Sequence, residues 1–462
     1  MRRLPLFLVL ICLYATKLIG QDIYPPQQAL ADMLSRNEFF EARKQRKLCG
    51  DTLDKSLELC YAFKMHGYLN RPDSSAIYLE RLLKEYPDFF GDRYSKVYFM
   101  NELLNLYAEM GKYSKKLEVY NIAEQIISPY LLTNDSIWAT QQLIAISRLR
   151  REDEEKLDIP QMTVTNLSKK KETTLTFTEE PILASVIEYN GVSVKTWIDT
   201  GWGNTVFMTK AIADKCKVKE LPSLEDNICV NGVSVRGYQA LIDSLKIGAI
   251  QFAHVPAIVV HGDFSSFAPD SVLSETSQLE YDSVMNSAGV VVGLPLLKRL
   301  GSIQLDWHKK KITMKLPCDV RYSMEEPTMF MLNKGLYTCV NINAVDCTGL
   351  IDTGAPRDCI ELTKKYYDAN RVNLLVNGIQ KEKSKDRRGM AQVASSLKYR
   401  PILNPKVTFN SKKVKLKIDD VIAWQEDTAL SGIKDGLIGC QFLKRLGSKV
   451  KLDFVNMQIM AE

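Results

Sequence analysis

The C-terminal part of the chain contains an internal repeat, which constrains the fold more than any other feature. With Asp199 aligned on Asp352, the segment LASVIEYNGVSVKTWIDTG lies over LYTCVNINAVDCTGLIDTG without a gap. Further on, VVGLPLLKRLGSIQLDWHKKKITM lies over LIGCQFLKRLGSKVKLDFVNMQIM, and LKRLGS is identical in both. Short apolar runs separated by glycine turns are typical of strands in an all-β barrel or sandwich. The sequence therefore predicts two diverged copies of one β-type lobe, at residues 181–316 and 330–462.

The segment before the repeat predicts helices instead of strands. Between residues 21 and 150, apolar residues recur at helical spacings and glycine is scarce. Three stretches are similar to tetratricopeptide-type helical hairpins, with a glycine at the tight turn between helices, as at Gly67 and Gly111. A plain helical bundle is the alternative for this domain. Residues 151–180 are rich in charged and polar side chains and predict a linker.

Each copy of the repeat carries the tripeptide Asp-Thr-Gly after an apolar run. The tripeptides are Asp199-Thr200-Gly201 and Asp352-Thr353-Gly354. Each copy later has two apolar residues followed by a glycine, at Gly293 and Gly439. Such a tripeptide is expected by chance about 0.1 times in a chain of this length. One Asp-Thr-Gly is most simply a turn between strands, but a pair at equivalent repeat positions predicts two acidic groups that act together.

This pattern resembles the aspartic peptidases of the pepsin and retropepsin type. In that family a strand ends in Asp-Thr-Gly, and a later apolar strand, here ending at Gly293 or Gly439, packs beneath it. GLIGCQFL in the second copy looks like the retropepsin form of that strand. The resemblance covers the repeat and implies two retropepsin-like β-barrel lobes related by a pseudo-twofold axis, similar to single-chain bacterial retropepsin-like proteins. The expected fold is therefore an α plus all-β multidomain chain, with a tetratricopeptide-like helical domain before the two lobes.

The resemblance implies that Asp199 and Asp352 are the catalytic pair of an endopeptidase. Two carboxyl groups about 3 Å apart do not both ionise readily, so they share one proton. The ionised group takes a proton from the attacking water, and the protonated group donates to the carbonyl oxygen of the scissile bond. This chemistry needs no covalent intermediate and no cofactor, and neither aspartate is permanently the acid or the base.

Four further residues would support the two loops. The family implies that Thr200 and Thr353 bridge the loops by hydroxyl-to-backbone hydrogen bonds. Gly201 and Gly354 leave room for the loops to approach each other, because a side chain at either position would collide.

Two positions depart from the family pattern. The residue after Asp-Thr-Gly is normally Ala, Ser or Thr; the second copy has Ala355, but the first has Trp202, whose indole either lines the cleft or obstructs it. Neither copy has a hydroxyl there to stabilise an ionised aspartate, so we expect raised pKa values and activity at mildly acidic to neutral pH. The hairpin around Gly232 is the expected flap, in which Tyr238 either contacts substrate or belongs to the sheet surface. The charged segment after Gly378 is expected to be a solvated loop, and a substrate clamp is the alternative.

The N-terminus and the cysteines indicate the compartment. Residues 1–20 combine a basic start with a short apolar run, which predicts a secretory signal peptide and a periplasmic or extracellular protein. In an oxidising compartment, neighbouring cysteines are disulfide candidates. The candidate pairs are Cys49/Cys60, Cys216/Cys229 and Cys339/Cys347.

The composition limits the classes of ligand and partner that the chain is expected to bind. A formal net charge of +6 over 462 residues is too small to indicate nucleic-acid binding, and the four histidines lack metal-ligand spacing, so we expect no metal and no cofactor. No segment after the N-terminal run predicts a transmembrane span. The expected partners are a peptide or protein substrate, and a protein partner on the N-terminal helices. Two alternatives to the endopeptidase stay open: a catalytically silent peptide-binding module, and a scaffold in which the helical repeats carry the function.

Overall fold

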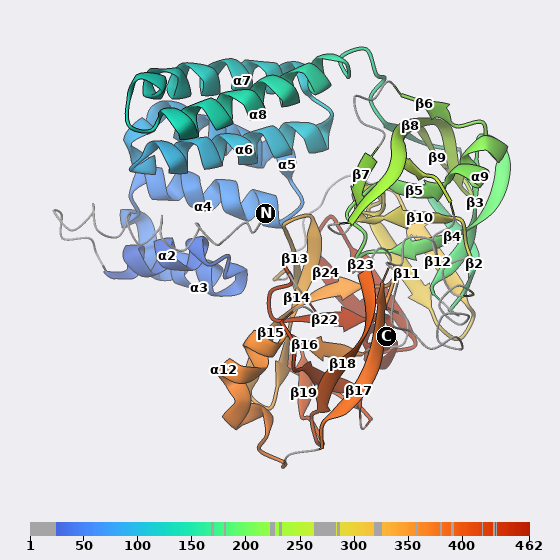
Figure 1. Ribbon diagram of the computed structural model, residues 1–462. Coiled ribbons are helices and arrows are strands. Elements are labelled where there is room, and N and C mark those ends of the chain that lie inside the picture. Colours follow the sequence, from blue (N-terminus) through green and yellow to red (C-terminus); the bar gives the residue numbers. More distant parts are fainter. Residues whose placement is uncertain are drawn as a thin grey trace. The chain divides into compact units, whose positions relative to one another are not determined.

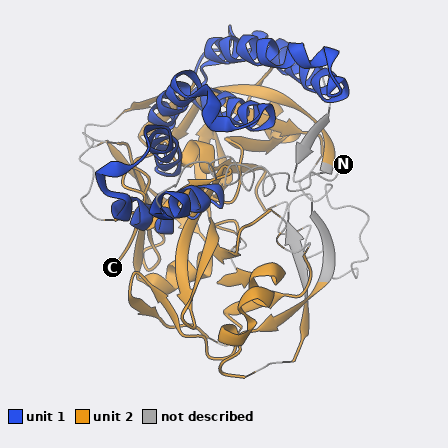
Figure 2. Cartoon of the chain, turned by 90° about the vertical axis from the view of Figure 1, so that its left-hand side faces the viewer, with its two compact units in different colours: residues 1–161 blue, residues 162–462 orange. Residues whose placement is uncertain are grey.

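The chain divides into two compact units in the computed structural model, residues 1–161 and 162–462 (Figure 2). The predicted signal peptide lies outside the described residues. The helical unit extends to Gln161 and not to residue 150, because its last helix continues past that point. The described residues are 25–167, 171–179, 182–221, 227–230, 233–262, 283, 287–317, 326–355, 359–378, 381–389, 392–417, 419–427, 430 and 432–462.

The described part of the first unit is helical (Figure 1). Helices adjacent in sequence pack on one another: α2 on α3, α4 on α5, α5 on α6, α6 on α7, and α7 on α8. Short 3-10 turns η2 (Gly50–Thr52), η3 (Pro87–Phe90) and η4 (Ser128–Leu132) join some of them. The helices are α2 (Pro25–Ser35), α3 (Phe39–Cys49), α4 (Lys55–Tyr68), α5 (Pro72–Glu85), α6 (Arg93–Met110), α7 (Tyr113–Ile127) and α8 (Ser136–Glu154).

Tight turns between paired helices are made by residues in the left-handed region. Asn37, Asn70 and Gly111 have φ of 53°, 56° and 70°, and Asn and Gly adopt this conformation more readily than other residues. Gly67, which we expected at a turn, lies inside α4, where an added Cβ would lie 3.3 Å from the Ser75 hydroxyl oxygen of α5. Its small size therefore serves the close approach of two helices. The helical hairpins are present, and their tetratricopeptide character stays a prediction.

The second unit begins with two strands and continues with the two copies of the repeat. Its leading strands are β1 (Thr163–Asn166) and β2 (Glu172–Thr178). The first copy contains β3 (Ala184–Tyr189), β4 (Val192–Asp199), β5 (Val206–Thr209), α9 (Lys210–Lys215), β6 (Lys219–Glu220), β7 (Asn227–Val230), β8 (Val233–Ile247), β9 (Ile250–Val260), β10 (Val290–Gly293), α11 (Leu294–Leu297), β11 (Ser302–Asp306) and β12 (Lys311–Lys315).

The second copy has corresponding elements. They are β13 (Met329–Leu332), β14 (Gly335–Ile342), β15 (Val345–Asp352), β16 (Ile360–Leu362), α12 (Lys364–Leu374), β17 (Lys383–Gly389), β18 (Gln392–Pro401), β19 (Val407–Phe409), β20 (Lys412–Val414), β21 (Val421–Trp424), β22 (Gly436–Gly439), α13 (Cys440–Leu446), β23 (Lys449–Asp453) and β24 (Gln458–Ala461).

The two copies share one strand order. The first runs β3-β4-β10-β5-β9-β8, and the second runs β14-β15-β22-β16-β21-β18. In both, the strand that ends in aspartate pairs in parallel with the strand that ends in glycine. The sequence repeat is therefore also a structural repeat, because equivalent strands occupy equivalent places.

The second-to-last strands of the two copies pair with each other (Figure 1). Strand β11 is antiparallel to β23, with Gln304 opposite Lys451 at the middle of the five paired residues. Leu305 and Leu452, which are equivalent in the repeat, are each opposite an apolar residue of the other copy. Strands β23 and β24 of the second copy thus join the sheet of the first copy through main-chain hydrogen bonds, while β13–β22 form a separate sheet.

The predicted linker is wrong for its second half. Residues 163–166 form β1, which pairs with β9, and residues 172–178 form β2, which pairs with both β12 and β3. The segment TNLSKKKETT looked like a linker because of its charge. However, β2 alternates exposed threonines with a buried Phe177, and this pattern is that of a half-buried strand.

The turns before the two aspartate strands are anchored in the same way. Asn190 and Asn343 both have positive φ, and their side-chain amides donate to the carbonyl oxygens of Cys216 (3.0 Å) and Leu374 (3.1 Å). The Asn190 side-chain oxygen also accepts from the Ser244 N–H at 2.9 Å. These aligned asparagines tie each turn to the helix and strand beside it.

The candidate disulfides are not formed by the described cysteines, which is a correction to the sequence-based expectation. Cys339 is opposite Thr348 across the β14–β15 pair, so it lies on the other face of the sheet from Cys347. Five cysteines of the candidate pairs are thiols in the structure. They are Cys49, Cys60, Cys216, Cys339 and Cys347.

Candidate active site

Two acidic residues end the equivalent strands β4 and β15. Asp199 is in register with Gly293 of β10, and Asp352 is in register with Gly439 of β22. A Cβ at Gly293 would lie 2.6 Å from the Trp202 carbonyl oxygen, so only glycine allows the loop after Asp199 to cross this strand. The aspartates are therefore held at the ends of buried strands by close backbone packing.

A reciprocal set of hydrogen bonds joins the two loops. The Thr200 hydroxyl accepts from the Thr353 N–H at 3.1 Å and donates to the Ile351 carbonyl oxygen at 2.8 Å. The Thr353 hydroxyl accepts from the Thr200 N–H at 3.0 Å and donates to the Ile198 carbonyl oxygen at 2.8 Å. Both threonines are 2% exposed. Each copy thus satisfies buried backbone groups of the other copy.

The glycines of the tripeptides contact the opposite carboxyl groups. The Gly201 N–H donates to Asp199 Oδ1 at 2.7 Å, and the Gly354 N–H donates to Asp352 Oδ1 at 2.8 Å. A Cβ added at Gly201 would lie 2.5 Å from Asp352 Cγ, and one added at Gly354 would lie 2.5 Å from Asp199 Cγ. The structure therefore brings both carboxyl groups together across the two loops.

The surroundings of Asp199 favour a shared proton. Burial raises the pKa of its carboxyl group, while hydrogen bonds with the Asp352 side chain and with backbone N–H groups of Gly201, Gly354 and Trp202 act in the opposite direction. The raised pKa means that desolvation outweighs these bonds. A carboxyl pair in contact under these conditions retains a proton, which then belongs to the pair.

The residue after each tripeptide differs in its packing. The Trp202 indole is 6% exposed, and its ring centroid lies 4.8 Å from that of Phe207. This burial does not support an indole standing free to obstruct the site. Ala355 is partly buried and packs against an apolar cluster of the second copy.

The expected flap hairpin is present in the first copy. Strands β7 and β8 pair from Asn227 opposite Arg236 to Val230 opposite Val233. Gly232, at the turn between them, lies outside the described residues. Tyr238 is buried in β8, and its ring lies 5.8 Å from that of His261. This burial contradicts the role of Tyr238 as a surface residue of the sheet, and its contact with substrate stays a prediction.

The charged segment of the second copy is not the solvated loop that we expected. Residues 383–389 form β17, which pairs with β18 as a hairpin. Strand β18 pairs with β21 as β8 pairs with β9, so this hairpin corresponds to β7–β8. Asn377, which precedes Gly378, instead donates to the Leu403 and Asn404 carbonyl oxygens. The prediction failed because the sequence KSKDRRG contains no large apolar residue, so the hydrophobic pattern did not indicate a strand.

A buried acid near the second loop escaped the sequence reasoning. Glu361 is 2% exposed, and its Oε2 accepts from the Trp424 indole N–H at 2.9 Å. A signal was available, since Glu361 interrupts an apolar strand where the first copy has Phe207. The thiol of Cys440, by contrast, is a poor nucleophile, because burial and the nearby Asp352 charge raise its pKa to about 12.

Neither a metal cluster nor a membrane-crossing helix occurs in the described ranges. No group of three or more His, Cys, Asp or Glu side chains there is arranged to hold a metal ion. None of the helices in this part of the chain combines the length and apolar character that crossing a membrane requires.

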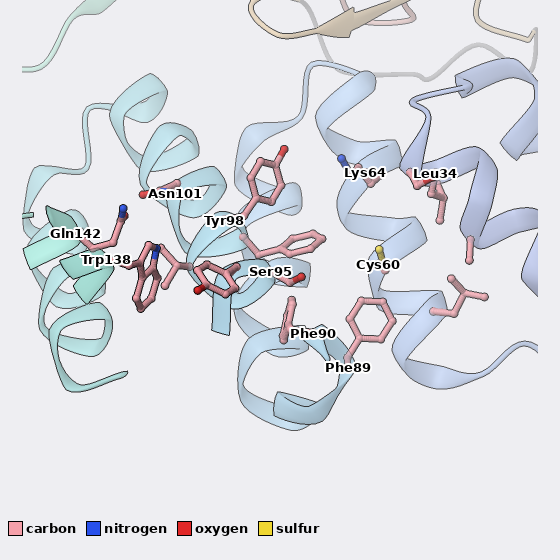
Figure 3. Close-up of a pocket in the computed structure, with 16 residues that line it drawn as sticks. Leu34, Cys60, Lys64, Phe89, Phe90, Ser95, Tyr98, Asn101, Trp138 and Gln142 are labelled. Carbon is pink, nitrogen blue, oxygen red and sulfur yellow. The ribbon is translucent and has the colours of Figure 1, made fainter. Parts of the chain in front are cut away.

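The helical unit contains a cavity of about 300 Å³ (Figure 3). Its wall is mainly apolar and includes several aromatic rings, with side chains from α2, α4, η3, α6 and α8. Lys64, Asn101 and Gln142 are among its few polar lining residues. The aromatic and aliphatic lining includes Leu34, Phe89, Phe90, Tyr98 and Trp138.

Comparison with known proteins points to one family. Residues 186–271 match the family described as "gag-polyprotein putative aspartyl protease", and this segment contains Asp199-Thr200-Gly201 and the β7–β8 hairpin. A retropepsin-like aspartic protease from Rickettsia conorii is 18% identical, with a TM-score of 0.22, over 34% of this chain and 95% of its own. The EIAV protease complexed with the inhibitor HBY-793 is 16% identical, with a TM-score of 0.17, over 27% of this chain and 92% of its own.

No curated protein matches the chain. The family match falls within the first copy of the repeat, on the segment that carries its aspartate and its hairpin. Residues 186–271 thus resemble the putative aspartyl proteases of gag polyproteins, and the helical unit lies outside the match.

Proposed function

We propose that the chain is an aspartic endopeptidase in which Asp199 and Asp352 together activate a water molecule. The observation that carries the proposal is the reciprocal contact of the two Asp-Thr-Gly loops, in which each glycine packs against the carboxyl group of the other copy. A turn with a purely structural role does not require a second carboxyl group from the other copy beside it. The family match of residues 186–271 supports the same chemistry.

The mechanism follows from the proton shared by the two carboxyl groups. The ionised group accepts a proton from water as the water attacks the scissile carbonyl carbon, and the protonated group donates to the carbonyl oxygen. The resulting tetrahedral species collapses when the peptide nitrogen takes up a proton and leaves. The buried threonine hydrogen bonds hold both carboxyl groups in place, so little reorganisation accompanies the reaction.

We further propose that the two copies are lobes related by a pseudo-twofold axis. The common strand order and the antiparallel β11–β23 pair, centred on Gln304 and Lys451, support this arrangement. Each lobe then supplies one half of the site, and neither would be active alone.

Cleavage of a peptide library by the mature chain tests the proposal. We expect Asp199→Asn and Asp352→Asn each to abolish cleavage, because a single carboxyl group cannot act as both acid and base. Asp346→Asn is a matched control, since Asp346 is an exposed residue of the same strand as Asp352. Peptide binding without cleavage by the unmodified chain would favour the silent binding module, and activity that survives either active-site change would refute the paired mechanism.

The site of action is a separate proposal. The composition of residues 1–20 supports export to the periplasm or outside the cell. Expression of the full chain in a bacterial host, followed by mass spectrometry of the product, tests it. We expect a mature N-terminus near Gln21 and recovery outside the cytoplasm, and an unprocessed cytoplasmic product would contradict export.

The cavity of the helical unit supports a docking role for a protein partner. Its size and aromatic wall fit one large apolar side chain. N-acetyl-phenylalanine amide should therefore bind saturably and change the fluorescence of Trp138, which lines the cavity. Substitution Ser95→Trp should fill the space and remove this binding, and an unsaturable titration of the unmodified chain would contradict the role.

A further inference from the structure

Trp202 and Ala355 occupy equivalent places in the two copies. Each follows Asp-Thr-Gly, and each N–H donates to the carbonyl oxygen of its own aspartate, at 3.4 Å for Trp202 and 3.3 Å for Ala355. Both carbonyl oxygens accept at 3.0 Å from the first residue of the helix that follows the glycine-ended strand, Leu294 or Cys440. The two backbones therefore match, and only the side chains differ.

In the second copy, the side of the loop beyond Ala355 is an apolar edge. We use this term for Ala355, Tyr399 and Ile433, which are only partly buried. These residues pack on a buried apolar cluster, and Ala355 is three positions from the Asp352 carboxyl group. The cluster comprises Leu397, Ile422, Trp424, Leu430 and Leu437.

In the first copy, the equivalent space is occupied by the chain itself. Phe207 lies opposite Val291 in the first copy, and Glu361 lies opposite Leu437 in the second. Phe207 and Glu361 therefore occupy equivalent positions in the two sheets. The Trp202 indole packs on the Phe207 ring and is buried. The first copy therefore has a large side chain of its own where the second copy has the methyl group of Ala355.

We propose that Trp202 makes the enzyme asymmetric in substrate choice. A large apolar side chain of the substrate, on one side of the scissile bond, packs on the apolar edge at Ala355. The Trp202 indole excludes a side chain of the same size on the other side. The inference rests on the proposed peptidase function and assigns a specificity-determining role to a residue that does not take part in proton transfer.

Two opposite substitutions test the proposal by profiling cleavage of a peptide library on both sides of the scissile bond. Trp202→Ala should raise cleavage of peptides with large apolar residues on the restricted side by roughly ten-fold or more, since one methylene in an apolar pocket already changes selectivity about 10-fold. Ala355→Leu should lower cleavage of such residues on the permissive side by a similar factor. Each change should leave the preference on the other side unaltered.

Trp202→Phe is an intermediate change in size. Phenylalanine keeps a ring beside Phe207 but is smaller than tryptophan, so part of the size exclusion should remain. Thermal unfolding of each variant identifies loss of fold, including that of Ala355→Leu, whose position is only partly buried.

The outcomes distinguish this proposal from the proposed function. No cleavage by the unmodified chain overturns the peptidase assignment and this inference with it. Cleavage with equal preferences on both sides, or folded Trp202→Ala and Ala355→Leu variants with unchanged profiles, overturns the specificity role alone.

Discussion

Replacement of Thr200 by valine removes the hydroxyl group from the junction of the two copies at nearly constant volume. The lost hydroxyl accepted from the Thr353 N–H and donated to the Ile351 carbonyl oxygen. Both backbone groups then lie in a buried site without a partner. The substitution therefore weakens the contact between the copies and leaves the local core filled.

The structure sets the size of this effect. Each stranded polar group destabilises the fold by about 1–3 kcal/mol, so Thr200→Val should lower the free energy of unfolding by about 2–6 kcal/mol. Thr353→Val strands the Thr200 N–H and the Ile198 carbonyl oxygen and should have an equal effect. The double variant should lose less than the sum, by about 0.5–3 kcal/mol, because water reaches the groups once the loops separate.

Urea unfolding followed by tryptophan fluorescence measures these values. All tryptophans except Trp138 lie in residues 162–462, so the signal reports mainly on the β unit. Thr200→Ser retains the hydroxyl and is expected to stay within about 1 kcal/mol of the unmodified chain. Thr338→Val is a matched control, since Thr338 is fully buried and its hydroxyl bonds within the second copy, to the Thr328 carbonyl oxygen.

The turnover number kcat should distinguish Thr200→Val, at the contact between the two copies, from the control Thr338→Val. A displacement of about 1 Å at the carboxyl groups lowers kcat roughly 100-fold, so we expect this loss for Thr200→Val and unchanged kcat for Thr338→Val. Thr200→Val with the unfolding midpoint and kcat of the unmodified chain would refute the reasoning. An additive double variant would show that the two hydroxyls act independently.

Three further predictions follow from the same site. Gly201→Ala should lower kcat roughly 100-fold, because the added Cβ would lie 2.5 Å from Asp352 Cγ, whereas Gly203→Ala has open space and should leave peptide-cleavage rates unchanged. Since burial raises the pKa of Asp199, the stability this carboxyl contributes is present below about pH 4 and is lost as the pH rises through its raised value. The melting temperature of Asp199→Asn, relative to that of the unmodified chain, should therefore increase from pH 4 to pH 8. A difference that stays constant over this range would contradict the raised pKa. The same raised pKa predicts an optimum of the cleavage rate well above pH 3. Asn343→Ala should lower the free energy of unfolding by about 1–3 kcal/mol in urea, because the Leu374 carbonyl oxygen loses its donor, and a neutral effect would contradict the anchoring role.

The repeat made much of the fold predictable. Aligned apolar runs become aligned strands, and the aligned asparagines at 190 and 343 make equivalent turns. The positions of Asp199 and Asp352 at strand ends followed from the same alignment. A duplicated sequence repeats its local propensities, its hydrophobic pattern and its turn residues together, so each copy supports the prediction for the other.

The failures share a physical cause. The segments at 163–178 and 383–389 are rich in Lys, Thr or Ser, and their charge indicated a solvated linker and a loop. Residues 163–166, 172–178 and 383–389 of these segments form strands, because neighbouring β9, β12 and β18 offer them backbone partners. Strand formation by polar residues depends on such non-local partners more than on intrinsic propensity. The burial of Glu361 likewise depends on Trp424, which is distant in sequence.

The sequence by itself determined that this chain carries two copies of one β unit, each with an acid directly after an apolar strand. These properties are local, since they depend on hydrophobic period and on short-range turn chemistry. The tertiary structure decided that the Thr200 and Thr353 hydroxyls bond across the copies, and that the buried Trp202 indole packs on the Phe207 ring. Those outcomes depend on the β11–β23 pairing and on the space that distant side chains leave, and no local pattern specifies them.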